Sequence, residues 1–340
     1  MERTGSTHST DSTDSTHSPG STRSSGSTDK TAATPTARAL RLTPLSLGGA
    51  GLGNLFTAVS DEDATRALDT AWDAGIRVFD TAPHYGLGLS ERRFGAALRD
   101  RPREEYVLST KVGRILEPVP EPSGDDPEGF AVPAAFQRVL DYSGDGVRRS
   151  LEASLERLGL DRIDVALIHD PDSHEEQALT EAFPALAKLR DEGVIGAVGV
   201  GMNQTRIPLR FVRETDIDVV LLAGRYTLLD RSGAELLDTA AERGVGIIIG
   251  GAFNSGLLVD PQPTSTYDYQ TVPEPVLANA LRLKGICERH GVPLRAAALQ
   301  FPSRHPAVRS VLIGARSPHE VRDGVEMAEL PIPDDLWTEV

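Results

Sequence analysis

Four side chains in the chain have the types needed to move a proton to or from a substrate oxygen: Asp80, Tyr85, Lys111 and His169. The phenol of Tyr85 can donate and accept a proton, but a free phenol has a pKa of about 10, too high for ready exchange at neutral pH. A nearby ammonium such as Lys111 would stabilise the phenolate and lower that pKa. Asp80 could pair with the lysine, and His169 could donate a hydrogen bond to the substrate oxygen. The set predicts acid–base chemistry at a carbonyl or alcohol.

These side chains can act together only if the elements that carry them end at the same place. Short apolar runs, typical of buried strands, alternate with helical patterns along the chain, which predicts βα units and a parallel sheet. We expect eight strands, at Leu45–Ala50, Val78–Ala82, Tyr106–Lys111, Val165–Asp170, Ala197–Met202, Val219–Gly224, Gly246–Gly251 and Ser310–Ala315. Eight such units favour a closed (β/α)₈ barrel of the α/β class, with an open doubly wound sheet as the alternative.

Helix boundaries and a glycine run bear on that choice. Helices are expected to begin after Ser60 and to end at Gly75, Gly159 and Gly244, because a hydroxyl caps a helix N-terminus and glycine ends a helix readily. The run Gly49–Gly53 follows the first strand, where a doubly wound fold would carry its dinucleotide fingerprint. Its glycine spacing differs from that fingerprint, and no helix opens directly after it. We therefore expect a turn in which the backbone approaches a ligand closely.

In a barrel of this kind, the C-terminal ends of the strands form the active-site face. Asp80 and Tyr85 follow the second expected strand, Lys111 ends the third and His169 the fourth, so three consecutive strands deliver ionisable groups to one rim. Each residue alone has an ordinary explanation, as a turn cap, a packed ring or a solvated charge. Their joint occurrence favours a catalytic centre.

The segments FDTAPHYG, LSTKVG and LIHD resemble the signature of the aldo-keto reductases, and the resemblance covers residues 45–337. Further segments, LGGAGLGNL, FDTAPHYGLGLSERRFG, LLAGRYTLLD and FNSGLL, are similar to the branch that contains L-fucose-oxidising aldose 1-dehydrogenases and pyridoxal dehydrogenases. The resemblance implies that Asp80, Tyr85, Lys111 and His169 form the catalytic tetrad. It also implies an NAD(P)-dependent interconversion of a carbonyl with an alcohol, or of a sugar hemiacetal with its lactone, because the hydride must come from a cofactor.

The resemblance further implies a set of cofactor-binding residues: Asn203, Phe253, Ser255, Gly256, Gly314, Ala315, Arg316, Ser317 and Glu320. Residues 314–320 look like a strand end, a turn and a helix start, with Ser317 and Glu320 as a capping box, and such an N-terminus suits a phosphate. Ala223 stands where relatives carry the Gln that holds the nicotinamide, and Arg225 or Tyr226 could replace it. Glu320 would repel a 2′-phosphate, which favours NAD over NADP.

The amino-acid composition limits the kinds of partner that the protein is expected to bind. The formal net charge of −15 disfavours nucleic acid and anionic membranes, which need clustered Lys and Arg, and no apolar run is long enough to span a bilayer. The single cysteine, Cys287, excludes an internal disulfide and a cysteine-based zinc site. We therefore expect a cytoplasmic protein with no metal and a small-molecule carbonyl or sugar substrate, with Cys287 buried in a late helix. The Ser/Thr-rich residues 1–38 are expected to be disordered and residues 39–340 to form the barrel.

Two other functions stay open at this point. Lys111 could instead be the nucleophile of a Schiff-base lyase or aldolase on the same barrel. A cofactor-binding barrel could also act as a non-catalytic sensing module. Substrate choice is expected to depend on the loops Arg114–Tyr142 and Val259–Pro275, which are rich in Pro, Asp and Gly and show no readable structure. The first loop could form a lid or a substrate wall, and the sequence carries no signal for an oligomeric state.

Overall fold

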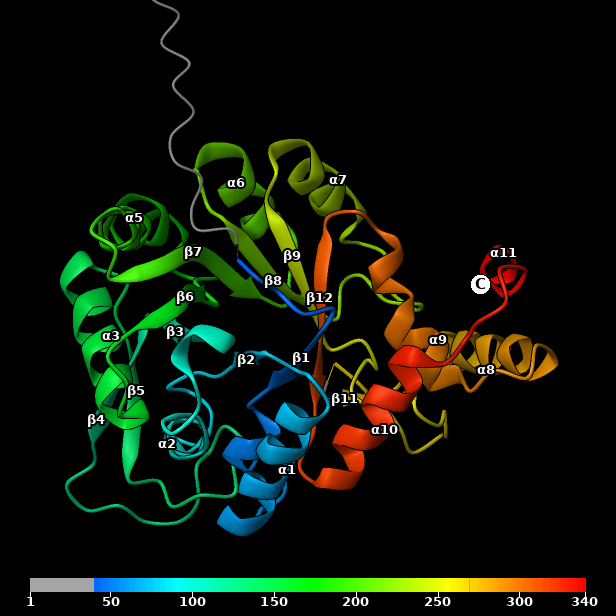
Figure 1. Cartoon of the computed structure of the whole chain (residues 1–340), viewed down its shortest axis with the longest axis horizontal. Helices are drawn as coiled ribbons and strands as arrows, with labels where there is room; N and C mark the ends of the chain where they lie inside the picture. The colour runs from blue at the N-terminus through cyan, green and yellow to red at the C-terminus, as the bar shows by residue number, and fades with distance from the viewer. Residues whose placement is uncertain (1–39, 269) are drawn as a thin grey trace, which may run out of the picture. The chain divides into compact units, whose positions relative to one another are not determined.

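The computed structural model describes residues 40–268 and 270–340, so the tail predicted at residues 1–38 lies outside the described residues. Within the described ranges, eight parallel strands form a closed barrel in the order β1-β12-β9-β8-β7-β6-β3-β2 (Figure 1). The strands are β1 (Leu45–Gly48), β2 (Val78–Asp80), β3 (Val107–Val112), β6 (Ile163–His169), β7 (Ile195–Met202), β8 (Val219–Ala223), β9 (Gly246–Gly250) and β12 (Val308–Gly314). The (β/α)₈ barrel is confirmed, and every expected strand overlaps an observed one to within two residues at each end.

Helices surround the barrel (Figure 1). They are α1 (Asp61–Asp73), α2 (Leu89–Leu98), α3 (Gly144–Leu158), α4 (Glu175–Gln177), α5 (Phe183–Asp191), α6 (Arg206–Glu214), α7 (Ala234–Arg243), α8 (Glu274–Arg289), α9 (Leu294–Gln300), α10 (Pro318–Glu329) and α11 (Leu336–Glu339). The side chain of Ser60 caps α1 by accepting a hydrogen bond from the backbone N–H of Asp63 at 3.0 Å. Gly159 and Gly244 end α3 and α7 in the left-handed conformation, so these predicted boundaries are confirmed.

Alternate residues of each barrel strand face opposite sides, as the pleat of a strand requires. The inward-facing positions form an apolar cluster of Val78, Val107, Val165, Leu167, Ala197, Val219, Leu221 and Ile248, with Leu40, Leu42 and Leu312 packed against it. The outward-facing positions, such as Phe79, Leu108, Ala166 and Ile168, join the larger core between the sheet and the helices. Full burial of each large apolar side chain contributes about 1.5–3 kcal/mol. This alternation also decides where the polar residues at the strand ends point.

Two segments that were expected to lack structure contain short hairpins. β4 (Arg114–Pro118) pairs antiparallel with β5 (Phe136–Leu140), and β10 (Thr266–Tyr267) pairs with β11 (Gln270–Thr271). The expectation for the loops Arg114–Tyr142 and Val259–Pro275 was therefore wrong in part. A long connection separates β4 from β5, so no tight turn marked this hairpin in the sequence.

Candidate active site

The inward-facing positions of three neighbouring strands place the polar side chains at one end of the barrel. Val78, Val107 and Val165 belong to the interior cluster, so residues two or four positions later on the same strands also point inward. Those residues are Asp80 on β2, Ser109 and Lys111 on β3, and Leu167 and His169 on β6. Because β2, β3 and β6 are adjacent in the barrel, their C-terminal ends bring these groups together.

Lys111 and Asp80 form a buried ion pair. The Lys111 Nζ donates to Asp80 Oδ2 at 2.6 Å and to the Thr81 carbonyl at 3.0 Å, while Ser109 Oγ donates to Asp80 Oδ1 at 2.5 Å. Burial alone would lower the pKa of Lys111, but the Asp80 carboxylate and Tyr85 reverse this effect and hold the pKa above its ordinary value. Lys111 therefore stays a cation within this pair.

Tyr85 lies against the ion pair. The Lys111 Nζ is 4.6 Å from the centroid of the Tyr85 ring, and the Tyr85 and His169 rings are perpendicular, with centroids 5.9 Å apart. Burial raises the pKa of Tyr85 above its ordinary value, and Lys111 opposes this effect without cancelling it. The ammonium alone predicts a net lowering of the Tyr85 pKa. That prediction is wrong, because the phenol has also been removed from water.

Glycines hold the loop that carries Tyr85. Gly51–Gly53 form a 3₁₀ turn, and a Cβ at Gly53 would lie 2.8 Å from the carbonyl carbon of Tyr85. Gly86 has a φ of +62°, and a Cβ on it would overlap the carbonyl oxygen of Gly53. The expected turn is present, but at Gly53 the backbone approaches Tyr85 rather than open space. The glycine run therefore positions the phenol.

His169 ends β6 and is 6% exposed. Burial lowers the pKa of its imidazole well below the ordinary value, and the charges of Lys111 and Arg114 lower it further. The ring is therefore neutral and carries a single N–H, which can donate to a substrate oxygen. The Tyr142 hydroxyl donates to the backbone carbonyl of His169 at 2.6 Å, and this hydrogen bond fixes the end of the strand.

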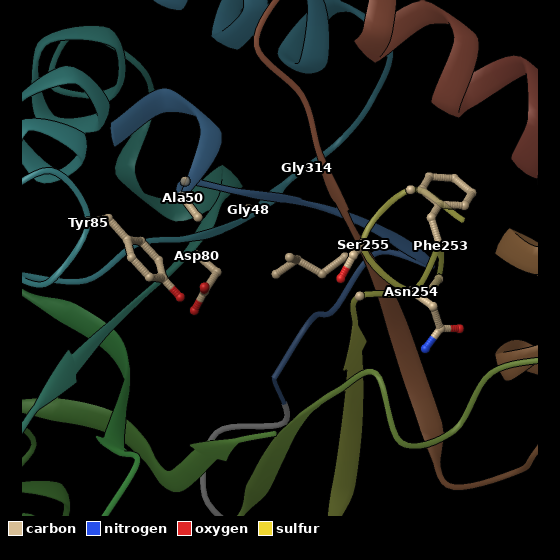
Figure 2. A pocket seen from close by; sticks show the side chains of 13 residues that line it. Gly48, Ala50, Asp80, Tyr85, Phe253, Asn254, Ser255 and Gly314 are labelled. Carbon is tan, nitrogen blue, oxygen red and sulfur yellow. The ribbon is translucent and has the colours of Figure 1, made fainter. Parts of the chain in front are cut away.

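A hollow of about 260 Å³ opens beside Tyr85 and Asp80, at the ends of β1, β9 and β12. Figure 2 shows the Tyr85 hydroxyl and the Asp80 carboxylate on one side of this hollow and Ser255 across from them. A Cβ at Gly256 or Gly314 would extend into open space, so a ligand can approach the backbone closely there. This open, glycine-lined wall suits an extended polar ligand.

A residue that lines the hollow also carries a polar atom without a partner. Asn254 lines the hollow in a left-handed conformation with a φ of +46°, and its Oδ1 is buried with no hydrogen-bond partner in residues 40–268 and 270–340. Such an atom costs free energy unless something binds it. The open, glycine-lined wall of the hollow fits the extended dinucleotide that the sequence motifs imply.

Comparison with known proteins agrees with this geometry. A model of the Aldo/keto reductase family matches residues 44–340. This chain belongs to the aldo/keto reductase family. It is 48% identical to a D-threo-aldose 1-dehydrogenase from Pseudomonas sp, over 89% of this chain and 94% of that protein. It is 44% identical to a pyridoxal 4-dehydrogenase from Microbacterium luteolum, over 88% of this chain and 93% of that protein.

A solved structure supports the fold. The holo form of an aldo-keto reductase from Bacillus halodurans superposes with a TM-score of 0.67 at 24% identity, covering 86% of this chain and 89% of that one. Family membership and these relatives make the protein an oxidoreductase that works with a nicotinamide cofactor, NAD or NADP.

This aldo-keto reductase places the nine residues implied to bind cofactor in different surroundings. Phe253, Ser255, Gly256 and Gly314 line the hollow together with Tyr85. Ala315, Arg316, Ser317 and Glu320 follow Gly314 at the start of α10 and do not line it. The expected capping box is confirmed in part: Ser317 Oγ accepts from the Glu320 N–H at 3.2 Å, but the Glu320 carboxylate accepts at 2.7 Å from the N–H of Arg316 rather than from that of Ser317.

Asn203 lies on the exposed side of the rim. Its side chain is exposed, and its backbone carbonyl accepts a hydrogen bond from Arg225 Nε at 2.7 Å. Arg225, one suggested replacement for the missing Gln, also pairs with Asp268 at 2.9 Å. Tyr226, the other suggestion, stacks on Phe301 with ring centroids 5.4 Å apart. Neither Arg225 nor Tyr226 lines the hollow.

Several residues around the site were not anticipated from the sequence. Gly48, Gly251, Ala252, Asn254 and Leu312 also line the hollow, beside Gly49 and Ala50 of the glycine run that was expected to approach a ligand. Ser109 bonds the Asp80 carboxylate, and Tyr142 bonds the His169 carbonyl. The position of Ser109, two residues before Lys111 on one strand, was a signal that alternation could have revealed. Tyr142 had no comparable signal, because it lies in a segment read as a loop.

Some classes of site are not found in the described part of the chain. None of its helices has both the length and the apolar character needed to span a membrane. The same residues contain no group of three or more His, Cys, Asp or Glu placed to hold a metal ion. Cys287 is buried in α8, as expected, and burial raises the pKa of its thiol to about 11.

Proposed function

We propose that this enzyme is an aldose 1-dehydrogenase, which oxidises the anomeric carbon of a sugar hemiacetal to give the lactone and which can also reduce an aldehyde to an alcohol. The observation that carries the proposal is the arrangement of Tyr85 between the buried Asp80–Lys111 pair and the glycine-lined hollow. The relative named D-threo-aldose 1-dehydrogenase, 48% identical, supports an aldose as the substrate. The relative named pyridoxal 4-dehydrogenase makes pyridoxal the second compound to test.

Tyr85 is the proposed proton carrier. When bound, the nicotinamide dinucleotide exchanges a hydride with the substrate carbon, which no side chain can do. In oxidation the Tyr85 phenolate takes the proton of the substrate hydroxyl, and the Lys111 ammonium, held by Asp80, stabilises that phenolate. The N–H of neutral His169 donates to the same substrate oxygen. Because burial raises the pKa of Tyr85, we expect oxidation to accelerate as pH rises and reduction to accelerate as pH falls.

The hollow is the proposed cofactor site, and NAD is the proposed preference. Phe253, Ser255, Gly256 and Gly314 would hold the dinucleotide along the hollow, with the turn before α10 at its adenosine end. In that turn the Arg316 guanidinium is 3.4 Å from the Glu320 carboxylate, so its charge is already balanced. A 2′-phosphate there would meet the carboxylate, whereas a ribose hydroxyl could donate to it.

The test is a panel of aldoses, aldehydes and pyridoxal with NAD and NADP, read by nicotinamide absorbance, for the parent and for Tyr85→Phe. We expect L-fucose or a related aldose to be oxidised with NAD, and Tyr85→Phe to lower kcat by about 10²–10⁴-fold while dinucleotide binding is retained. A Tyr85→Phe enzyme that oxidises the aldose as fast as the parent would contradict the assigned proton carrier.

The Schiff-base alternative fits this site poorly. A lysine nucleophile must lose its proton, but the Asp80 carboxylate raises the pKa of Lys111 and keeps the ammonium charged. Borohydride reduction in the presence of a carbonyl substrate should therefore leave no adduct on Lys111. A covalent adduct found there by mass spectrometry would reopen the lyase interpretation.

A further inference from the structure

A set of polar side chains lies on the other side of Tyr85 from the hollow. The hollow opens at the ends of β1, β9 and β12, whereas Arg114 follows β3 and Asp170 follows β6, elsewhere around the barrel. Glu128, from the connection between β4 and β5, and His84, the neighbour of Tyr85, complete the set. We call these four residues, His84, Arg114, Glu128 and Asp170, the polar wall.

The polar wall is continuous with the proposed catalytic histidine. Arg114 Nη2 donates to Asp170 Oδ2 at 2.9 Å, and Arg114 Nη1 lies 3.7 Å from Glu128 Oε2. The same Glu128 oxygen is 3.7 Å from His84 Nδ1, while Asp170 Oδ2 is 3.4 Å from His169 Nε2. The His84 and His169 rings meet edge to face, with centroids 5.6 Å apart. These contacts close a circle of polar groups beside the phenol.

Part of the wall can still accept a ligand. The side chains of Asp170 and Glu128 are 27% and 44% exposed. Arg114 Nε and His84 Nδ1 are buried and have no hydrogen-bond partner among the residues the structure describes. Asp170 has a φ of +41°, an uncommon backbone conformation for a residue other than glycine, and such conformations concentrate at functional sites. The wall is therefore not fully satisfied by its own contacts.

The net charge of the polar wall favours neutral ligands over anionic ones. Burial lowers the pKa of His84 to about 3, so this ring is neutral, and the two carboxylates of the wall exceed its single guanidinium. The neighbouring Arg138 is held by Asp126, at 2.6 and 2.7 Å, and also lies 3.4 Å from Glu128 Oε1, so with Arg138 and Asp126 counted the carboxylates still outnumber the guanidiniums. A phosphate or carboxylate on the substrate would be repelled. A hydroxyl can donate to a carboxylate and accept from a guanidinium at once, so neutral polyols suit the wall.

We propose that the polar wall binds secondary hydroxyl groups of a neutral aldose, with Asp170 and Glu128 accepting hydrogen bonds from them and Arg114 donating. The wall then determines which aldose is oxidised, while Tyr85 and Lys111 act on the anomeric oxygen. This inference rests on the proposed function and names the residues that recognise the substrate.

The experiment is a double-change cycle, in which substitutions in the enzyme are combined with removal of single hydroxyl groups from the substrate. The parent, Asp170→Asn and Glu128→Gln are compared on L-fucose and on its monodeoxy analogues, by kcat/KM for oxidation with NAD. Asn tolerates the left-handed backbone at position 170, so this variant is expected to fold. For the parent we expect loss of at least one hydroxyl to lower kcat/KM by about tenfold or more, as for a hydrogen bond to a charged group. In the variant that lacks the carboxylate bonded to that hydroxyl, loss of the same hydroxyl should lower kcat/KM by less than about threefold.

A structural role would give a different result. A wall that only anchors the hairpin β4–β5 would lower kcat/KM equally for every analogue, with no dependence on which hydroxyl is missing, and that result would overturn the proposal. Asp216→Asn is the matched control: Asp216 pairs with Arg190 at 2.7 Å on the surface before β8, at the opposite end of the barrel, and should show no coupling. A parent enzyme that oxidises no aldose would refute the proposed function itself, and the wall proposal with it.

Discussion

Removing one member of the Asp80–Lys111 pair is expected to destabilise the protein more than removing both. In Asp80→Asn the Lys111 ammonium keeps its hydrogen bond to Thr81 but loses its counter-charge, and in Lys111→Met the Asp80 carboxylate keeps only Ser109. The Lys111 side chain is 1% exposed and that of Asp80 3%, so water cannot replace the missing partner. Breaking a buried pair costs about 3–5 kcal/mol, whereas replacing both charges with neutral groups of similar volume is often close to neutral.

The assay is equilibrium unfolding in urea of the parent, both single variants and Asp80→Asn/Lys111→Met. We expect each single variant to lose about 3–5 kcal/mol and the double variant to lose less than either. Asp216→Asn, which breaks an exposed pair, should change stability by less than about 1 kcal/mol. If the double variant loses the sum of the two single losses, the two charges do not interact, and the account of a coupled buried pair is wrong.

The pH dependence of Asp80→Asn gives an independent check. Without the carboxylate, burial should lower the folded-state pKa of Lys111 below its ordinary value of 10.5. The unfolded chain would then bind the extra proton between these two values, so the stability of this variant should rise as pH increases toward 10.5. The parent, whose Lys111 pKa is raised, should show no such rise over that interval.

Three further predictions follow from other groups. His84 has a pKa of about 3 in the folded protein against 6.5 in a free side chain, so the unfolded chain binds its proton first as pH falls below 6.5. This group should therefore lower the free energy of unfolding by up to about 1.4 kcal/mol for each pH unit below 6.5. Between pH 7 and 5, the urea midpoint of His84→Gln should fall less than that of the parent. Gly86→Ala, which places a Cβ against Gly53 at a positive φ, should lower both the unfolding midpoint and kcat; unchanged values of both would show that the Tyr85 loop is not held as described. Glu320→Gln should raise kcat/KM with NADPH relative to NADH, and an unchanged ratio would contradict the role given to this carboxylate.

The barrel could be predicted because its strands are short apolar runs separated by helices with clear caps. The proposed catalytic residues could be predicted because each follows or ends such a run, and parallel strands present their C-terminal ends on one face. Strand alternation also explains Ser109, which shares the inward face of β3 with Lys111. In these cases the information is local, and it lies within a few residues of the feature it predicts.

The polar wall and the hairpin behind it depend on contacts between distant parts of the chain. Asp126 meets Arg138 across the connection between β4 and β5, and Asp170 meets Arg114 from a different strand end. Neither hydrophobic periodicity nor a helix cap indicates such pairs in the sequence, so the segment Arg114–Tyr142 was expected to be an unstructured loop. The direction of the Tyr85 pKa shift could not be predicted for a related reason. The motif predicts the ammonium that lowers this pKa, whereas the burial that raises it depends on the assembled fold.

Small residues on a neighbouring strand leave room inside the barrel for the buried lysine. On β3 and β6 the inward positions near the active-site end carry large side chains, Lys111 and Leu167, which are paired in register. The next strand, β7, places Gly199 opposite Leu167 and Gly201 opposite His169. A Cβ at Gly201 would lie 3.4 Å from Lys111 Cε, and one at Gly199 would lie 2.8 Å from the Leu167 side chain. The small residues of β7 thus leave volume that the large side chains on the neighbouring strands, Lys111 and Leu167, fill.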